Sequence, residues 1–175
     1  MNPLDIIAKY YPVGSEAYRI LVIHSRSVAD KALAIARMHP EMNLDLTFVE
    51  EAAMLHDIGI FRCNAPDIDC HGDAEYICHG YLGAEGYPRH ARVCERHTGT
   101  GITLAMIEER GLPLPHRDFM PETLEEQLIC YADKFYSKTK LDKEKSVEKV
   151  KQGLSKYGNE TVERFDNWCK LFLGE

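Results

Sequence analysis

The side chains with the clearest chemical potential in this chain are the adjacent imidazole and carboxylate of His56 and Asp57. They follow the apolar run Ala52-Ala53-Met54-Leu55 and precede Ile58-Gly59, where the glycine is suited to end a helix. An aspartate in the last turn of an apolar helix faces the negative end of the helix dipole and loses hydration. A bound cation removes both costs, so the pair predicts a metal site. The alternative is a solvated helix end beside a hydrogen-bonded core histidine.

Other histidine and aspartate residues lie on or at the ends of separate expected helices. The full set of candidate metal ligands is His24, His56, Asp57, His79, His97 and Asp133. Imidazole and carboxylate donors without a thiolate suit divalent iron, manganese, nickel, cobalt or zinc, and we expect two such ions. The first ion takes His24, His56, Asp57 and Asp133. The second shares Asp57 as a bridging carboxylate and adds His79 and His97, which leaves positions open for water and substrate.

Helices must position these ligands, because apolar residues recur at helical spacing and no segment shows the alternation of a strand. We expect helices at 3–11, 15–38, 46–58, 77–87, 89–96, 102–110 and 123–135, followed by two covering helices between 146 and 174. The stretches 61–76 and 112–121 are expected to be irregular connections. The predicted fold class is all-α, a single-domain helical bundle over 1–175 with a ligand-bearing core at 15–140 and covering helices at 141–175.

The composition limits the partners that the chain can have. A net charge of -7 and a pI near 5.6 argue against binding to duplex nucleic acid or to an anionic membrane surface. No apolar run is long enough for a membrane helix, and no signal peptide is evident, so we expect a cytoplasmic protein. The lysines from 138 to 156 are interspersed with acidic residues and are expected to form a solvated face, with homodimer or ligand contacts as a minor alternative.

The order of the candidate ligands, together with the run His56-Asp57-Ile58-Gly59, resembles the HD superfamily of metal-dependent phosphohydrolases. The resemblance covers residues 15–140, and the two additional histidines are typical of the dinuclear branches of that superfamily. His79-Gly80-x-x-Gly83-Ala84 and Ala132-Asp133 are similar to the bacterial diadenosine tetraphosphatases. The resemblance implies an HD-type bundle that hydrolyses a small phosphorylated substrate, either a nucleotide or another phosphate ester.

In this hydrolase interpretation, the two ions lower the pKa of a water molecule, and the resulting hydroxide attacks phosphorus. Asp57 is then the central catalytic residue. Arg92, Arg96 and Lys134 are further catalytic candidates, because fixed cations offset the charge on phosphate oxygens. Arg92 and Arg96 lie one turn apart on the expected helix before His97, and the alternative is that they are surface arginines. Lys134 has the alternative role of balancing the adjacent Asp133.

Two other classes of function use the same residues. The mixed-valent diiron oxygenases share this ligand order and cleave small polyols or phosphonates, so an oxygenase is the alternative enzyme. A noncatalytic sensor of a metal or a nucleotide is the third class. The three differ in what can be measured: a hydrolase releases phosphate without oxygen, an oxygenase needs iron and consumes O2, and a sensor turns over neither.

Overall fold

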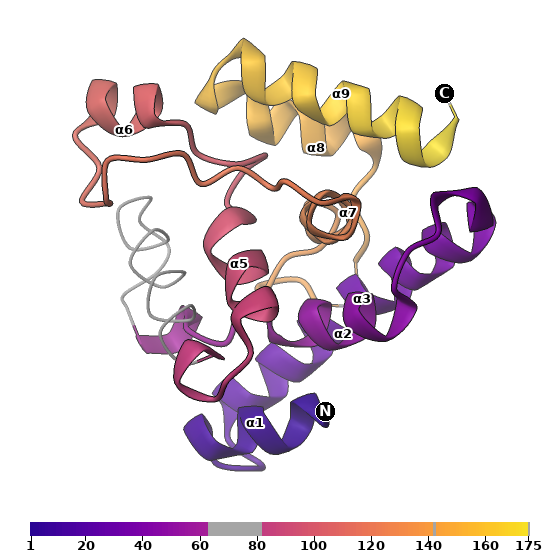
Figure 1. Cartoon of the computed structure of the whole chain (residues 1–175), viewed down its shortest axis with the longest axis vertical. Coiled ribbons are helices and arrows are strands. Elements are labelled where there is room, and N and C mark those ends of the chain that lie inside the picture. Colours follow the sequence, from indigo (N-terminus) through magenta and orange to yellow (C-terminus); the bar gives the residue numbers. More distant parts are fainter. Residues whose placement is uncertain (63–81, 142, 175) are drawn as a thin grey trace.

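The computed structural model describes residues 1–62, 82–141 and 143–174, and within them the chain is helical (Figure 1). The α-helices are α1 (Pro3–Tyr10), α2 (Glu16–Met38), α3 (Leu46–Leu55), α5 (Pro88–Arg96), α6 (Leu104–Arg110), α7 (Leu124–Asp133), α8 (Val147–Leu154) and α9 (Asn159–Leu173). Three 3-10 turns are η1 (Pro40–Met42), η2 (Ile60–Arg62) and η3 (Ser155–Tyr157). These ranges contain isolated β-bridges but no β-strand, so the predicted all-α class is confirmed. No helix in them is both long and apolar enough to cross a membrane.

Polar caps begin the helices that carry the candidate site. The Ser15 side chain accepts a hydrogen bond from the backbone N–H of Tyr18, and Thr123 does the same for Glu126. Each bond satisfies a backbone donor that has no partner inside its helix. The predicted starts of the helices at 15–38 and 123–135 are therefore confirmed.

Three helices differ from the predicted boundaries by two or three residues, and one of them is α7, which ends at Asp133 and not at 135. Helix α3 ends at Leu55, so His56 and Asp57 lie in the turn that follows it instead of on the helix itself. Helix α6 begins at Leu104 and not at 102, because Ile102 forms backbone hydrogen bonds of 3.0 and 2.7 Å with Phe119. The expected connection at 61–76 and the expected helix at 77–87 lie largely outside the described residues.

The core forms where α2, α3, α5 and α7 pack together. Helix α7 is covered on another side by α9, which lies beside α8 at the end of the molecule away from α1 (Figure 1). The rings of Tyr131 on α7 and Phe165 on α9 stack with their centroids 5.2 Å apart, and both are fully buried. The C-terminal helices therefore fix the position of α7, which ends at the candidate ligand Asp133.

Replacing Phe165 by alanine is expected to lower the free energy of unfolding by about 3–5 kcal/mol, because it leaves a cavity between α7 and α9. Leu171→Ala, on the same helix, is the control, since Leu171 is 38% exposed. It should change the same quantity by less than about 1 kcal/mol. Urea unfolding followed by circular dichroism measures both, and equal losses would contradict the role given to the buried ring.

Candidate metal centre

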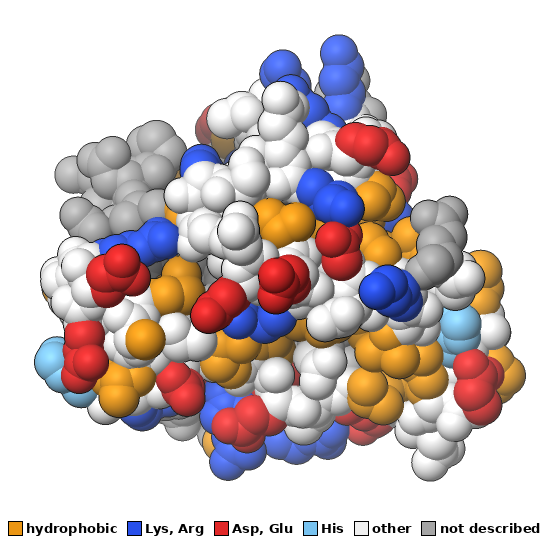
Figure 2. Space-filling model, turned by 90° about the horizontal axis from the view of Figure 1, so that it is seen from above, with side chains coloured by type: hydrophobic (Ala, Val, Ile, Leu, Met, Phe, Trp, Pro, Cys, Tyr) orange, Lys and Arg blue, Asp and Glu red, His pale blue; other side chains and the backbone are white. Residues whose placement is uncertain are grey.

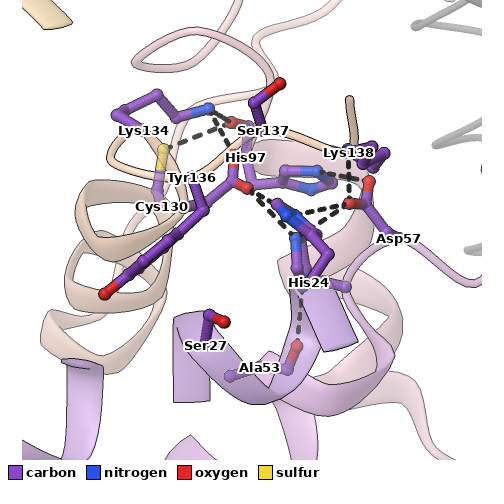
Figure 3. A network of polar contacts seen from close by, with 12 residues as sticks. His24, Ser27, Ala53, Asp57, His97, Cys130, Lys134, Tyr136, Ser137 and Lys138 are labelled. Atoms are coloured by element: carbon purple, nitrogen blue, oxygen red, sulfur yellow. Dashed lines mark hydrogen bonds and ion pairs between the residues drawn. The ribbon is translucent and has the colours of Figure 1, made fainter. Parts of the chain in front are cut away.

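Four of the six candidate ligands meet at one point. His24 comes from α2, His56 and Asp57 come from the turn after α3, and Asp133 is the last residue of α7. One donor atom from each residue lies within 4.8 Å of the donor atoms of the other three. Figure 3 shows the His24 ring directed toward the carboxylate of Asp57. The convergence predicted for the first ion is therefore present in the geometry.

The two imidazoles face the same two carboxylate oxygens. His24 Nε2 lies 3.1 Å from Asp57 Oδ2 and 3.0 Å from Asp133 Oδ1. His56 Nε2 lies 3.1 and 3.3 Å from the same two atoms. Two nitrogens and two oxygens thus surround one small, buried volume. This donor set fits a divalent cation such as iron, manganese, nickel, cobalt or zinc.

The backbone orients the histidine rings. His56 Nδ1 donates a hydrogen bond of 2.6 Å to the carbonyl oxygen of Ala53, and His97 Nδ1 donates one of 2.8 Å to the carbonyl of Cys94. Because a carbonyl can only accept, the proton of the neutral ring lies on Nδ1 and the lone pair lies on Nε2. Both rings therefore keep a proton on Nδ1, and Nε2 is the atom that can bind a metal once its own proton is released.

Buried charge shifts the pKa values of the cluster. Burial alone would lower the pKa of His56, but the negative charges of Asp57 and Asp133 outweigh it and raise that pKa to about 10. Burial would also raise the pKa of Asp57, yet Lys138 and His56 hold it well below its usual range. Lys134 and the imidazoles lower the pKa of Asp133 in the same way, against the effect of burial. Both carboxylates are ionised, and nearby cations balance them.

His97 approaches the other side of the Asp57 carboxylate. Its Nε2 lies 3.4 Å from Asp57 Oδ1, whereas His24 and His56 face Oδ2. Asp57 therefore presents one oxygen to the four-residue cluster and the other to His97, which is the arrangement that a bridging carboxylate requires. His79, the sixth candidate ligand, lies outside the described residues.

Two lysines complete the cluster. Lys134 Nζ lies 2.8 Å from Asp133 Oδ2 and donates a hydrogen bond to the carbonyl of His97, so the ion pair considered for it is formed. Lys138 Nζ lies 2.6 Å from Asp57 Oδ2, and Figure 3 shows it beside that carboxylate. The prediction that lysines 138–156 form a solvated face is wrong for Lys138, because the segment after α7 turns it toward the cluster.

The two arginines lie elsewhere. Arg92 is exposed on α5. Arg96 forms ion pairs with Glu122 at 2.9 Å and with Glu126 at 3.1 Å. Both glutamates lie at the start of α7, whereas the metal cluster lies at the other end of that helix. Neither arginine lines the cavity at the cluster. Of the three basic candidates, the structure places only Lys134 at the site.

A cavity of about 420 Å³ opens beside the cluster. Asp57, His97, Asp133, Lys134 and Lys138 form one part of its wall, and residues of α6, α8 and η3 form another part. The candidate ligands are therefore reachable by a small molecule, which is the arrangement expected of a catalytic site and not of a closed structural one.

Comparison with known proteins identifies the family. The HD domain family matches residues 21–137, which include the four clustered residues and His97. The chain belongs to the HD domain family. Membership in this family agrees with the histidine and aspartate cluster, which could hold a metal ion.

Three relatives share part of their sequence with the chain. It is 31% identical over 149 residues to a tRNA (cytidine(56)-2'-O)-methyltransferase of Picrophilus torridus, covering 82% of this chain and 37% of that protein. It is 31% identical over 140 residues to the protein of the same name from Thermoplasma volcanium, covering 77% and 35%. It is also 36% identical over 128 residues to an uncharacterized protein of Methanocaldococcus jannaschii, covering 69% and 68%. The chain thus spans about a third of the length of the two methyltransferases. No solved structure gives a significant match.

Replacing His56 by alanine is expected to weaken binding of Mn²⁺ at least about tenfold, because one of four converging donors is lost. His90→Ala is the matched control. His90 is also a buried imidazole, but its Nε2 faces Glu51 at 3.2 Å, outside the cluster. Isothermal titration calorimetry of the full chain measures both affinities. Equal weakening in the two variants would contradict the assignment of the four residues as one metal site.

Lys138→Met is expected to strengthen binding of the first ion roughly tenfold, or about 1.4 kcal/mol. The reason is that the ammonium of Lys138 occupies the Asp57 oxygen that the ion needs. Lys140→Met, an exposed lysine two residues away, should leave the affinity unchanged. Weaker binding in Lys138→Met would mean that Lys138 orients Asp57 instead of competing for it.

Proposed function

We propose that this HD protein is a metal-dependent phosphohydrolase that acts on a small, nucleotide-like phosphate ester. The observation that supports this proposal best is the meeting of metal ligands and cations in one cavity. Asp57 and Asp133 line that cavity beside the ammonium groups of Lys134 and Lys138. Hydrolysis of a phosphate ester benefits from both a metal ion and ammonium groups. Cations offset the negative charge of the phosphate oxygens, and a metal ion also makes the phosphorus more electrophilic.

The bound ions and the protein side chains have separate tasks in this mechanism. A divalent ion supplies a Lewis acid, which polarises the phosphoryl group and makes water a better nucleophile near neutral pH. Asp57 and Asp133 hold their positions through the imidazoles that face them. With a divalent ion at Asp57 and Asp133, the ammonium groups of Lys138 and Lys134 would no longer be needed to balance these carboxylates. Their ammonium groups then bind and orient the phosphate oxygens of the substrate.

We further propose that two ions bind. The first is held by His24, His56, Asp57 and Asp133. The second would be held by His97 and His79, together with the Asp57 carboxylate that both ions would share. The separate approaches of His97 to Asp57 Oδ1 and of His24 to Asp57 Oδ2 support this assignment. We attribute no methyl transfer to the chain, since the residues gathered at the cavity are those of a metal site.

Asp57→Asn is expected to lower turnover by at least about a thousandfold, because the bridging carboxylate is lost while the size of the side chain is kept. The assay measures phosphate release from nucleotides, dinucleoside polyphosphates and phosphonates with Mn²⁺ or Fe²⁺, while oxygen uptake is monitored. Glu51→Gln is the control, since Glu51 pairs with the N-terminus and His90 outside the cluster. Full activity of Asp57→Asn would overturn the proposal, and oxygen consumption without phosphate release would favour the oxygenase alternative.

A further inference from the structure

The wall of the cavity is strongly cationic. Six basic side chains line it, and these are Arg110, Lys134, Lys138, Lys145, Lys149 and Lys156. Among the described residues, the acidic side chains in the lining are Asp57 and Asp133, which are the candidate metal ligands. Because Lys134 and Lys138 already pair with these two carboxylates, the other four cations require a separate explanation.

These four cations have no carboxylate partner within the described residues. Arg110 donates to the carbonyl oxygen of Tyr157 at 2.8 Å, and Lys145 donates to the carbonyls of Lys134 and Tyr136 at 3.3 and 3.2 Å. Carbonyl oxygens carry no net charge, so these bonds position the cations without neutralising them. Lys149 and Lys156 form no ion pair within the described part of the chain and are exposed, so their ammonium groups remain available to a ligand.

This concentration of positive charge contrasts with the rest of the protein. The chain has a net charge of -7. Figure 2 shows the end of the molecule that carries α6, α8 and α9, and acidic and basic side chains are interspersed on its outer surface. A local excess of cations inside a cavity of an acidic protein attracts a small anion, whereas a broad basic surface would suit a nucleic acid.

The same part of the cavity also offers an apolar surface. Ile102, Met106 and Leu112 line it on one side, and Val150 and Leu154 of α8 line it on another. The Tyr157 ring lies in the lining as well, with Lys156 Nζ 4.8 Å from its centroid. A volume of about 420 Å³ lies within the usual range for a small-molecule site. The cavity can therefore bind one ligand that has both an apolar part and an anionic group.

We infer that Arg110, Lys149 and Lys156 form a second anion-binding site, and that the ligand is a small molecule with two anionic groups. One phosphate of this ligand lies at the metal centre, and a second phosphate or phosphate chain contacts these three cations. A ring or another apolar body packs against the wall made by Ile102 and Val150. The part of this assignment that concerns the metal centre rests on the proposed function.

Two of the three residues of the second site lie beyond the region that matches the family. The HD match ends at residue 137, whereas Lys149 lies on α8 and Lys156 in η3. The hydrogen bond from Arg110 to Tyr157 links the end of α6 to η3, which carries Lys156, and Lys149 lines the same cavity. The C-terminal segment thus selects the ligand, in addition to supporting α7.

Inorganic tripolyphosphate, titrated calorimetrically into the full chain in metal-free buffer, tests the second site without requiring catalysis. The double variant Lys149→Ala/Lys156→Ala is expected to bind tripolyphosphate at least about tenfold more weakly than the unchanged chain. Lys140→Ala/Lys143→Ala is the matched control, because it removes the same charge from exposed lysines of the same segment that do not line the cavity. Its affinity should stay within about twofold. An unchanged affinity in the first variant, or an equal loss in both, overturns the inference.

A kinetic comparison separates this inference from the proposed function. In the metal-loaded chain, Lys149→Ala/Lys156→Ala should raise the KM for a nucleoside triphosphate and leave the KM for p-nitrophenyl phosphate, which has one anionic group, unchanged. If no phosphate compound is hydrolysed but tripolyphosphate binding depends on the two lysines, the anion site stands and the proposed function fails. If hydrolysis occurs and the variant changes neither KM nor tripolyphosphate binding, the anion site fails and the proposed function stands.

Discussion

Two ionised aspartates buried against the same pair of imidazoles are the constraint on which the rest of the structure depends. Buried carboxylates are costly unless cations and hydrogen bonds compensate them, so Asp57 and Asp133 must stay close to their partners. Those partners come from separate helices, since His24 lies in α2 and His56 follows α3. The packing of α2, α3 and α7 therefore has to be precise at this one point. The stack of Tyr131 on Phe165 holds α7 from the side away from the cluster.

The start, middle and end of helix α7 have different structural roles. Glu126 in its first turn is buried and pairs with Arg96 from α5, which fixes the start of the helix. Its middle supplies Tyr131 to the core, and its end supplies Asp133 to the cluster. The segment that follows turns back, and Lys145 is hydrogen-bonded to two carbonyls just after the helix. Residues that stabilise the core and a residue of the candidate metal site thus lie close together on α7.

Sequence reasoning succeeded where the signal is local or follows a motif. Ser15 and Thr123 cap their helices as predicted, because capping depends on residues three positions apart. The convergence of His24, His56, Asp57 and Asp133 followed from their order along the chain. Lys138 could not be found in this way, because its position depends on how an irregular segment returns to the cluster. The carboxylate partners of Arg96 were equally hidden, since Glu126 lies 30 residues away in the sequence.

The ammonium groups beside the two aspartates have a consequence for the maturation of the protein. A zinc finger stays unfolded until its metal arrives, because nothing else compensates its ligands. Here Lys134 and Lys138 already compensate the carboxylates, so we expect a newly synthesised chain to fold before any ion is bound. Scarcity of metal would then reduce the fraction of active molecules without exposing the chain to proteolysis.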